Sequence, residues 1–471
     1  MEIPPGRPGN LTPEEEEKLR KFWEMFLHVC GVLDEEASAE TESSTTQEKA
    51  AAAGPEKSKK KRLGLFKKKK DKNKDAAPSG KAPGSDIIKE NDPEDKWGEN
   101  KSYHDTLAKH PPEEIRATIW SMVKHDNPDA LLLRFLRARK WDPQRALVML
   151  ISTMDWRKSQ MHVDDDIMVN GEEYALLNAN SSDPVIKKSG EDFLAQLRLG
   201  KSYCYGIDKS GRAINIVRAR LHRAGDQSEE SLERFTVYLI ETARHLLAPP
   251  ADTACVVFDL TGFSLANMDY TPVKFMIKCF EANYPESLGV VLVHKAPWVF
   301  QGIWKIVRGW LDPVVASKVN FTNNLQDLEE FILAERIPED MEGKSGWNYK
   351  YVEPVPGEND RMKDVATRDK MLQEREGLYD EYESRTLEWI NETDSTRRAD
   401  INARRNELAT KLRESYWRLD PYVRSRSLYD RLGVIKSDGT LDYYPAAAKA
   451  EPTTNGTTPA ATETSANDDV D

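Results

Sequence analysis

The chain is poor in cysteine. Cys30, Cys204, Cys255 and Cys279 are the only four among 471 residues, and no two of them form a C-x-x-C pair. Disulfide frameworks and zinc ribbons need closely spaced cysteines, so we exclude both and expect a reducing, cytoplasmic setting. The eight histidines also lie far apart, without the spacing of metal ligands. We therefore predict no bound metal and no cofactor.

Long apolar runs and glycine-rich phosphate loops are lacking as well. No stretch approaches about 18 consecutive apolar residues, so we expect no membrane-spanning helix. The segment Met1–Asn10 contains prolines and no apolar core, so we expect no secretory signal there. Neither G-x-G-x-x-G nor G-x-x-x-x-G-K-[ST] occurs, which argues against nucleotide binding. The net charge of −12 argues against nucleic acid as a partner.

Positive charge is concentrated in one segment. Residues Lys57–Lys74 hold eleven lysines and arginines against the single Asp71. Such a block repels itself and buries no apolar surface, so we predict disorder over 34–95, and likewise over the Ala/Thr-rich tail 441–471. The block either contacts an anionic membrane, acts as a nuclear localisation signal or is only a solvated linker. The residues expected at the membrane are Lys59, Lys60, Lys61, Arg62, Phe66, Lys67 and Lys68.

Helix caps and apolar periodicity predict helices in the N-terminal part of the chain. Thr12 and Pro13 begin an amphipathic helix within 1–33, which we expect to pack on the body of the protein. A helical lobe is predicted over 96–165, with helices that begin at Asn127-Pro128 and Asp142-Pro143.

A charged extension over 354–440 is predicted to hold further helices. Within it, residues 360–432 carry apolar side chains at near-helical spacing. These helices either pack back on the body or form a coiled-coil site for a partner.

Short apolar runs alternate with helices between 166 and 353. The runs ACVVFDL at 254–260 and GVVLVH at 289–294 are apolar throughout, which is typical of strands buried on both faces. The segment Gly206–Gly211 joins two earlier β-rich runs as a hairpin. We therefore predict an α/β domain with a mainly parallel sheet.

Three segments contain residues that could have a specific function. Ser264 lies in G-F-S-L-A, close to the G-x-S-x-G elbow of serine esterases, but Ala266 replaces the last glycine and no acid is placed by motif, so an ordinary turn serine is favoured. The segment 297–311 (PWVFQGIWKIVRGWL) is either a core helix or a helix that meets the membrane interface. The cations of Arg134–Lys140 either complement a helix dipole or hold a phosphate.

Five motifs, in order, resemble the CRAL-TRIO lipid-transfer family, and within it the fungal phosphatidylinositol transfer proteins of the yeast Sec-fourteen type. They are LLLRFLRARKWD at 131–142, YGIDKSGRAI at 205–214, VVFDLTGFS at 256–264, NYPE at 283–286 and KAPWVF…WLDPVVASKV at 295–319. The resemblance covers 97 to about 352 and the segment 6–22. It implies a helical lobe, an α/β lobe whose sheet floors a lipid pocket, and a gate helix matching 297–311. The gate residues would be Trp298, Phe300, Ile303, Trp304, Val307 and Leu311.

The resemblance also implies a headgroup site. Relatives that bind phosphatidylinositol use residues matching Arg139, Lys140, Glu286 and Lys318, all present here, while Val315 stands where the family usually has a threonine. Relatives that also bind phosphatidylcholine have a serine and a threonine at the positions of Ala254 and Val256. We therefore expect poor phosphatidylcholine exchange and a second, more apolar ligand, such as a sterol or a squalene-like lipid.

The expected function is non-vesicular lipid transfer without catalysis. At about 0.8 kcal/mol per CH₂, moving two acyl chains through water costs on the order of 20 kcal/mol, which an enclosed apolar pocket removes. We expect a monomer that is transiently peripheral on anionic membranes. The alternatives are a lipid sensor or adaptor that presents its ligand to a partner enzyme without bulk transfer, and a serine esterase that uses Ser264.

Overall fold

A computed structural model describes residues 2–33 and 95–445. The polybasic block, nearly all of the linker and most of the tail expected from the sequence lie outside these residues. The N-terminal lobe is helical and consists of α1 (Pro13–Val29), α3 (Glu99–Lys109), α4 (Pro112–Val123), α5 (Pro128–Ala138) and α6 (Pro143–Asp155). Thr12 caps α1 with a capping box, and α1 buries Phe22, Trp23 and Phe26 in a core shared with α4, α5 and α6.

Two further helices connect this lobe to the sheet, and the sequence analysis did not predict them. Helices α7 (Met168–Ala179) and α8 (Pro184–Leu199) pack against each other, after the π-helical segments Trp156–Gln160 and Val163–Ile167. Asp183 caps α8 at its start, and Gly200, in the left-handed conformation (φ 62°), ends it. Both signals are present in the sequence and predict α8, whereas no side chain caps the start of α7.

The sheet has five strands in the order β1-β2-β3-β4-β5. They are β1 (Ser202–Ile207), β2 (Ala213–Arg218), β3 (Ala254–Asp259), β4 (Leu288–His294) and β5 (Val319–Thr322). The first two form the predicted antiparallel hairpin, and β2 to β5 are parallel. The predicted fold class is therefore confirmed.

Different elements cover the two faces of the sheet. One face packs on a filled core that includes Leu328 of α13 (Leu325–Glu329) and Trp347. The other faces α9 (Glu229–His245), α10 (Tyr270–Lys278) and α11 (Phe300–Arg308), with the short α12 (Pro313–Ser317) next to β5. This second face carries the candidate site.

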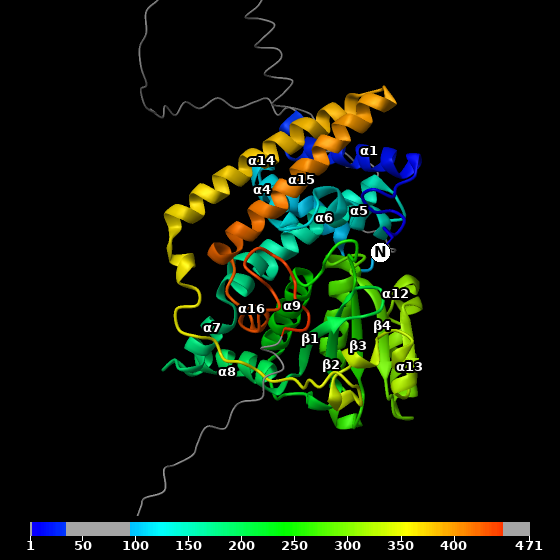
Figure 1. Cartoon of the computed structure of the whole chain (residues 1–471), viewed down its shortest axis with the longest axis vertical. Helices are drawn as coiled ribbons and strands as arrows, with labels where there is room; N and C mark the ends of the chain where they lie inside the picture. The colour runs from blue at the N-terminus through cyan, green and yellow to red at the C-terminus, as the bar shows by residue number, and fades with distance from the viewer. Residues whose placement is uncertain (1, 34–94, 446–471) are drawn as a thin grey trace, which may run out of the picture.

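The extension packs back on the helical lobe. Helices α14 (Val365–Asn391) and α15 (Ser395–Val423) form a pair that crosses α1 and α4 at the top of Figure 1. Their side chains Tyr382, Trp389, Leu408 and Leu412 belong to the same apolar core as Trp23 of α1. The apolar stripes of 360–432 are therefore used inside the molecule.

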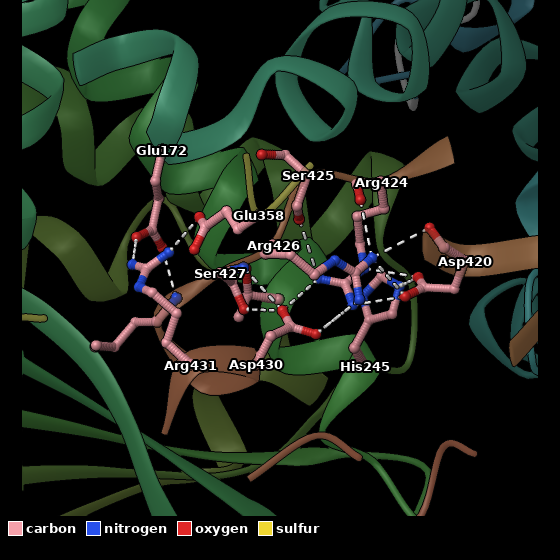
Figure 2. A network of polar contacts seen from close by, with 12 residues as sticks. Glu172, His245, Glu358, Asp420, Arg424, Ser425, Arg426, Ser427, Asp430 and Arg431 are labelled. Atoms are coloured by element: carbon pink, nitrogen blue, oxygen red, sulfur yellow. Dashed lines mark hydrogen bonds and ion pairs between the residues drawn. The ribbon is translucent and has the colours of Figure 1, made fainter. Parts of the chain in front are cut away.

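A network of charges ties the end of the extension to the body. Arg424 binds Asp420 (2.7 Å) and Asp430 (2.8 Å), next to α16 (Leu428–Arg431). Figure 2 shows Arg431 reaching Glu172 of α7, with which it forms an ion pair. Because these groups are almost fully buried, each charge depends on its partner.

Candidate functional site

An apolar cavity lies between the sheet and helices α9, α10 and α11. The space open to the centre of a water-sized sphere is about 300 Å³, and all unfilled space, including the mouth, is about 1970 Å³. Most of the side chains that line it are apolar and come from every surrounding element. They include Val217, Ala254, Val256, Phe258, Val291 and Val293 from the sheet, Phe235, Leu239 and Ile240 from α9, and Val273, Met276 and Ile277 from α10.

Strand periodicity produces the apolar floor. Successive side chains of a strand point to opposite faces, so Val256 and Phe258 line the cavity, while Cys255 and Val257 enter the filled core on the other side. The sequence predicted strands that are apolar on both faces. What it did not show is that only one of these faces is filled by protein side chains.

Helix α11, which lies in the segment expected to form a gate, provides one wall of the cavity. Five of the six residues expected in the gate line the cavity: Phe300, Ile303, Trp304 and Val307 of α11, and Leu311, which follows it. Trp298 instead points away, and 85% of it is exposed. The helix is shorter than the expected segment 297–311. The Phe300 N–H closes a turn onto the Pro297 carbonyl (2.8 Å) where the helix begins, and Gly309 follows its last residue.

Two of the expected headgroup residues meet at the edge of this cavity. The Lys318 ammonium lies 3.8 Å from the Glu286 carboxylate, and both side chains are partly exposed. Their chain neighbours Ser287 and Val319 line the cavity, as does Val315. Val315, Ala254 and Val256 present no hydroxyl to the cavity.

Arg134 supports this corner. Glu286 has a left-handed backbone (φ 53°), which a residue with a side chain rarely adopts. The Arg134 guanidinium donates a hydrogen bond to the Glu286 carbonyl (3.0 Å) and so links α5 to the turn before β4. The sequence pattern places Arg134 among the cations of α5 and carries no signal of its contact with Glu286.

The other two expected residues lie just beyond α5. The Arg139 guanidinium is bound to the Glu99 carboxylate of α3 at 2.6 Å. Burial raises the pKa of Glu99, and the charge of Arg139 opposes that rise. Lys140 is exposed. In this structure Arg139 is thus paired within the helical lobe, whereas Glu286 and Lys318 pair with each other.

Ser264 has the environment of a cap residue. Its hydroxyl donates to the Asn267 side-chain oxygen (3.0 Å) at the start of a short 3₁₀ turn. His294, the only histidine that follows Ser264 in the sequence, shares a hydrogen bond with the Thr322 hydroxyl (3.0 Å). The Ser264 hydroxyl therefore binds an amide oxygen and not a general base.

This chain is similar in sequence to known protein families and to curated proteins. The model of the CRAL/TRIO domain matches residues 197–343, and that of the CRAL/TRIO N-terminal domain matches residues 88–152. The CRAL-TRIO domain-containing protein C3H8.02 of Schizosaccharomyces pombe is 42% identical over 436 residues, which are 91% of this chain and 92% of that protein. The phosphatidylinositol transfer protein CSR1 of Eremothecium gossypii is 39% identical over 445 residues, which are 92% of this chain and 98% of that protein. The solved structure of Sfh5 covers 48% of this chain and 71% of its own at 16% identity, with a TM-score of 0.33, too weak a likeness to place any residue.

Within residues 2–33 and 95–445, no helix has both the length and the apolar character needed to cross a membrane.

Proposed function

The chain belongs to the CRAL-TRIO family, a family of lipid-binding and lipid-transfer proteins, and on this premise we propose that it carries phosphatidylinositol and a second, more apolar lipid between membranes without catalysis. The observation that supports this most is the apolar cavity between the sheet and α11. A hollow of this composition replaces the bilayer as a solvent for acyl chains, at about 0.8 kcal/mol per CH₂. The proposed carrier consists of 96–165 and 166–353.

The edge of the cavity at Glu286 and Lys318 is the proposed headgroup site. The Lys318 ammonium would pair with the lipid phosphate, and the Glu286 carboxylate would accept hydrogen bonds from inositol hydroxyls. An ion pair of 3.8 Å between partly exposed side chains is weak, so a headgroup can separate it at little cost. Lys140, which follows α5 and is exposed, would add positive charge from the helical lobe, and Arg139 would do so only on leaving Glu99.

The proposed gate is α11. Its apolar side chains close the cavity, and its cations Lys305 and Arg308 suit the surface of an anionic membrane. Outward movement of this one helix would open a path for a lipid. The exposed Trp298 has the amphipathic ring that is favoured at headgroup depth and would contact the membrane first.

A transfer assay between liposomes tests the proposal. Mass spectrometry of lipids extracted from the purified protein should detect phosphatidylinositol. The protein should also move this lipid from donor to acceptor vesicles. The double variant Glu286→Gln/Lys318→Ala should lose most of this transfer, and Lys344→Ala, which removes an exposed cation elsewhere, should keep it. If the purified protein bound no lipid of any kind, the proposed carrier function would be excluded.

The same assay separates the carrier from a lipid sensor or adaptor. Tight binding without transfer would favour the sensor. In the proposed carrier, 354–440 is a structural brace, which is supported by the burial of Tyr382 and Leu412 in the core of the helical lobe. An esterase is not favoured by the contacts of Ser264, and resistance of Ser264 to a fluorophosphonate probe is expected.

A further inference from the structure

Glu281 lies beside the end of the proposed gate and binds two segments that are distant from it in the sequence. It belongs to the π-helical segment Cys279–Asn283, which follows α10. Its Oε1 accepts a hydrogen bond from the backbone N–H of Asp312 (2.7 Å). Its Oε2 accepts from the Lys96 ammonium (2.6 Å) and from the Trp97 indole N–H (3.2 Å). Both carboxylate oxygens are therefore engaged.

Lys96 joins this network to the gate segment itself. Besides binding Glu281, its ammonium donates a hydrogen bond to the backbone carbonyl of Trp310. Trp310 and Asp312 flank Leu311, the last residue of the gate segment. The end of the gate is therefore held twice, through a carbonyl that binds Lys96 and an N–H that binds Glu281. Hydrogen bonds to charged groups are about twice as strong as those between neutral groups.

The segment that carries Glu281 is fixed to the helical lobe. The carbonyl of the neighbouring Ala282 accepts a hydrogen bond from the Thr153 hydroxyl of α6 (3.0 Å), and both residues are buried. The Glu281 side chain is only 6% exposed, whereas that of Lys96 is 45% exposed. Glu281 is therefore anchored, and its bonds hold the end of the gate segment against the helical lobe.

Apolar packing alone holds α11 less firmly than it holds a core helix. Among the residues of α11, only Ile303 is buried. The side chains of Phe300, Trp304 and Val307 line the cavity, so part of their surface faces unfilled space instead of packed atoms. Side chains without such neighbours lose the corresponding dispersion contacts. The polar bonds at the end of the gate segment therefore contribute a larger share of what keeps it closed.

We propose that Glu281 is a positioning residue that keeps the gate closed, with Lys96 as its partner. This inference rests on the proposed function, because it takes α11 as the gate. Together the two side chains form a latch between the helical lobe and the peptide groups on either side of Leu311. Neither side chain belongs to the lining of the cavity. The latch therefore sets how often the cavity opens, and not which lipid fills it.

A cysteine on the gate can report its opening. All four native cysteines are buried and free, so a thiol reagent reaches them only when the fold itself opens. In the variant Ile303→Cys, the added thiol lies under α11 and should react each time the gate opens. Adding Glu281→Gln or Lys96→Met to this variant should raise the labelling rate at 303 roughly tenfold, because a hydrogen bond to a charged group is lost.

The native cysteines and two further variants separate a latch from a general loss of stability. Mass spectrometry assigns each label to a peptide, and the native cysteines should keep their wild-type labelling rate. Lys96→Arg retains the cation and should keep the labelling at 303 slow. Lys363→Met, which breaks an exposed ion pair with Asp360, is the control and should also change nothing. Unchanged labelling at 303 in both Glu281→Gln and Lys96→Met, or an equal rise at the native cysteines, would overturn the inference.

The release of phosphatidylinositol separates this inference from the proposed function. Glu281→Gln should release preloaded phosphatidylinositol to acceptor vesicles faster than the wild type, while the amount loaded at equilibrium stays the same. Faster labelling at 303 in a protein that loads no lipid would contradict the carrier and support the latch. Normal loading and transfer with unchanged labelling would contradict the latch alone.

Discussion

At the residue scale, we expect side chains on one strand to set which headgroups the cavity accepts. Ala254 and Val256 line the floor and offer no hydrogen bond to a choline lipid phosphate. In the double variant Ala254→Ser/Val256→Thr, two hydroxyls of almost unchanged volume would face the cavity. We expect the phosphatidylcholine content of the lipid-exposed protein, measured by mass spectrometry, to rise roughly fivefold or more, since each new bond contributes about 1 kcal/mol.

Val257 supplies the matched control for that experiment. It is adjacent on β3 but faces the filled core, so Val257→Thr adds a hydroxyl that no ligand can reach. This variant should lose stability and gain no phosphatidylcholine. An equal gain in both variants would show that the floor does not select the headgroup.

A buried histidine makes stability depend on pH. Burial lowers the pKa of His125 from 6.5 to about 4, with Arg244, Arg413 and Lys124 acting in the same direction and Asp126 against it. Below pH 6.5 the unfolded chain therefore binds a proton that the folded chain does not, so the free energy of unfolding decreases as the pH falls towards 4. The loss approaches about 1.4 kcal/mol per pH unit.

Urea unfolding at about pH 7 and about pH 5.5 measures this loss in the free energy of unfolding. His125→Gln should lose about 1 kcal/mol less than the wild type over that interval, because the glutamine does not titrate. His162→Gln, at an exposed site, is the control and should follow the wild type. If His125→Gln also follows the wild type, the acid sensitivity comes from other groups, such as the neighbouring His245, whose pKa burial also lowers.

Residue identities were easier to foresee than their pairings. The motifs singled out Glu286 and Lys318, and the structure brings these two together. It pairs Arg139 with Glu99, which comes from a helix with no recognised motif.

At the scale of elements, one buried ion pair joins the extension to the helical lobe. Arg405 of α15 binds Asp129 of α5 at 2.6 Å, and both side chains are buried. Asp129→Ala leaves the guanidinium buried without its counter-charge, which should cost about 3–5 kcal/mol in the free energy of unfolding by urea.

A second substitution checks the cause of that loss. Asp129→Ala/Arg405→Met removes both charges and should recover part of the stability. Asp360→Ala, which breaks an exposed ion pair with Lys363, should change nothing measurable. A double variant as unstable as the single one would mean that packing, and not the unpaired charge, dominates.

Elements with caps or periodicity were predictable, and their packing partners were not. The helices at Thr12, Asn127 and Asp142 begin where their caps indicated. The apolar spacing of α14 and α15 indicated helices but left open what they cover, since a coiled coil and a docked pair share that pattern. Only tertiary contacts such as Arg405 with Asp129 decide between them.

At the scale of the whole molecule, the end of the extension and residues 441–445 cover the edge of the sheet. The sequence assigned 441–445 to a disordered tail, and the contact of Tyr444 with β1 corrects that boundary. The N–H groups of Cys204 and Ile207 on the edge strand β1 donate to the hydroxyls of Tyr429 (2.6 Å) and Tyr444 (3.0 Å). An unpaired edge strand is a site of aggregation, so this cover protects the molecule. The family motifs stop short of these tyrosines, which is why the sequence did not link them to β1.

The distribution of charge along the chain predicts how the molecule meets a membrane. The whole chain has a net charge of −12, but Lys57–Lys74 is strongly basic. At about 1 kcal/mol per cation near an anionic leaflet, deletion of 57–74 should abolish most sedimentation with phosphatidylserine liposomes at low salt. Deletion of the equally long 39–56, which is acidic, is the control and should leave binding intact or stronger.

Added salt should weaken wild-type binding, because screening shortens the reach of the cations. Unchanged sedimentation without 57–74 would leave α11 and Trp298 as the membrane contact.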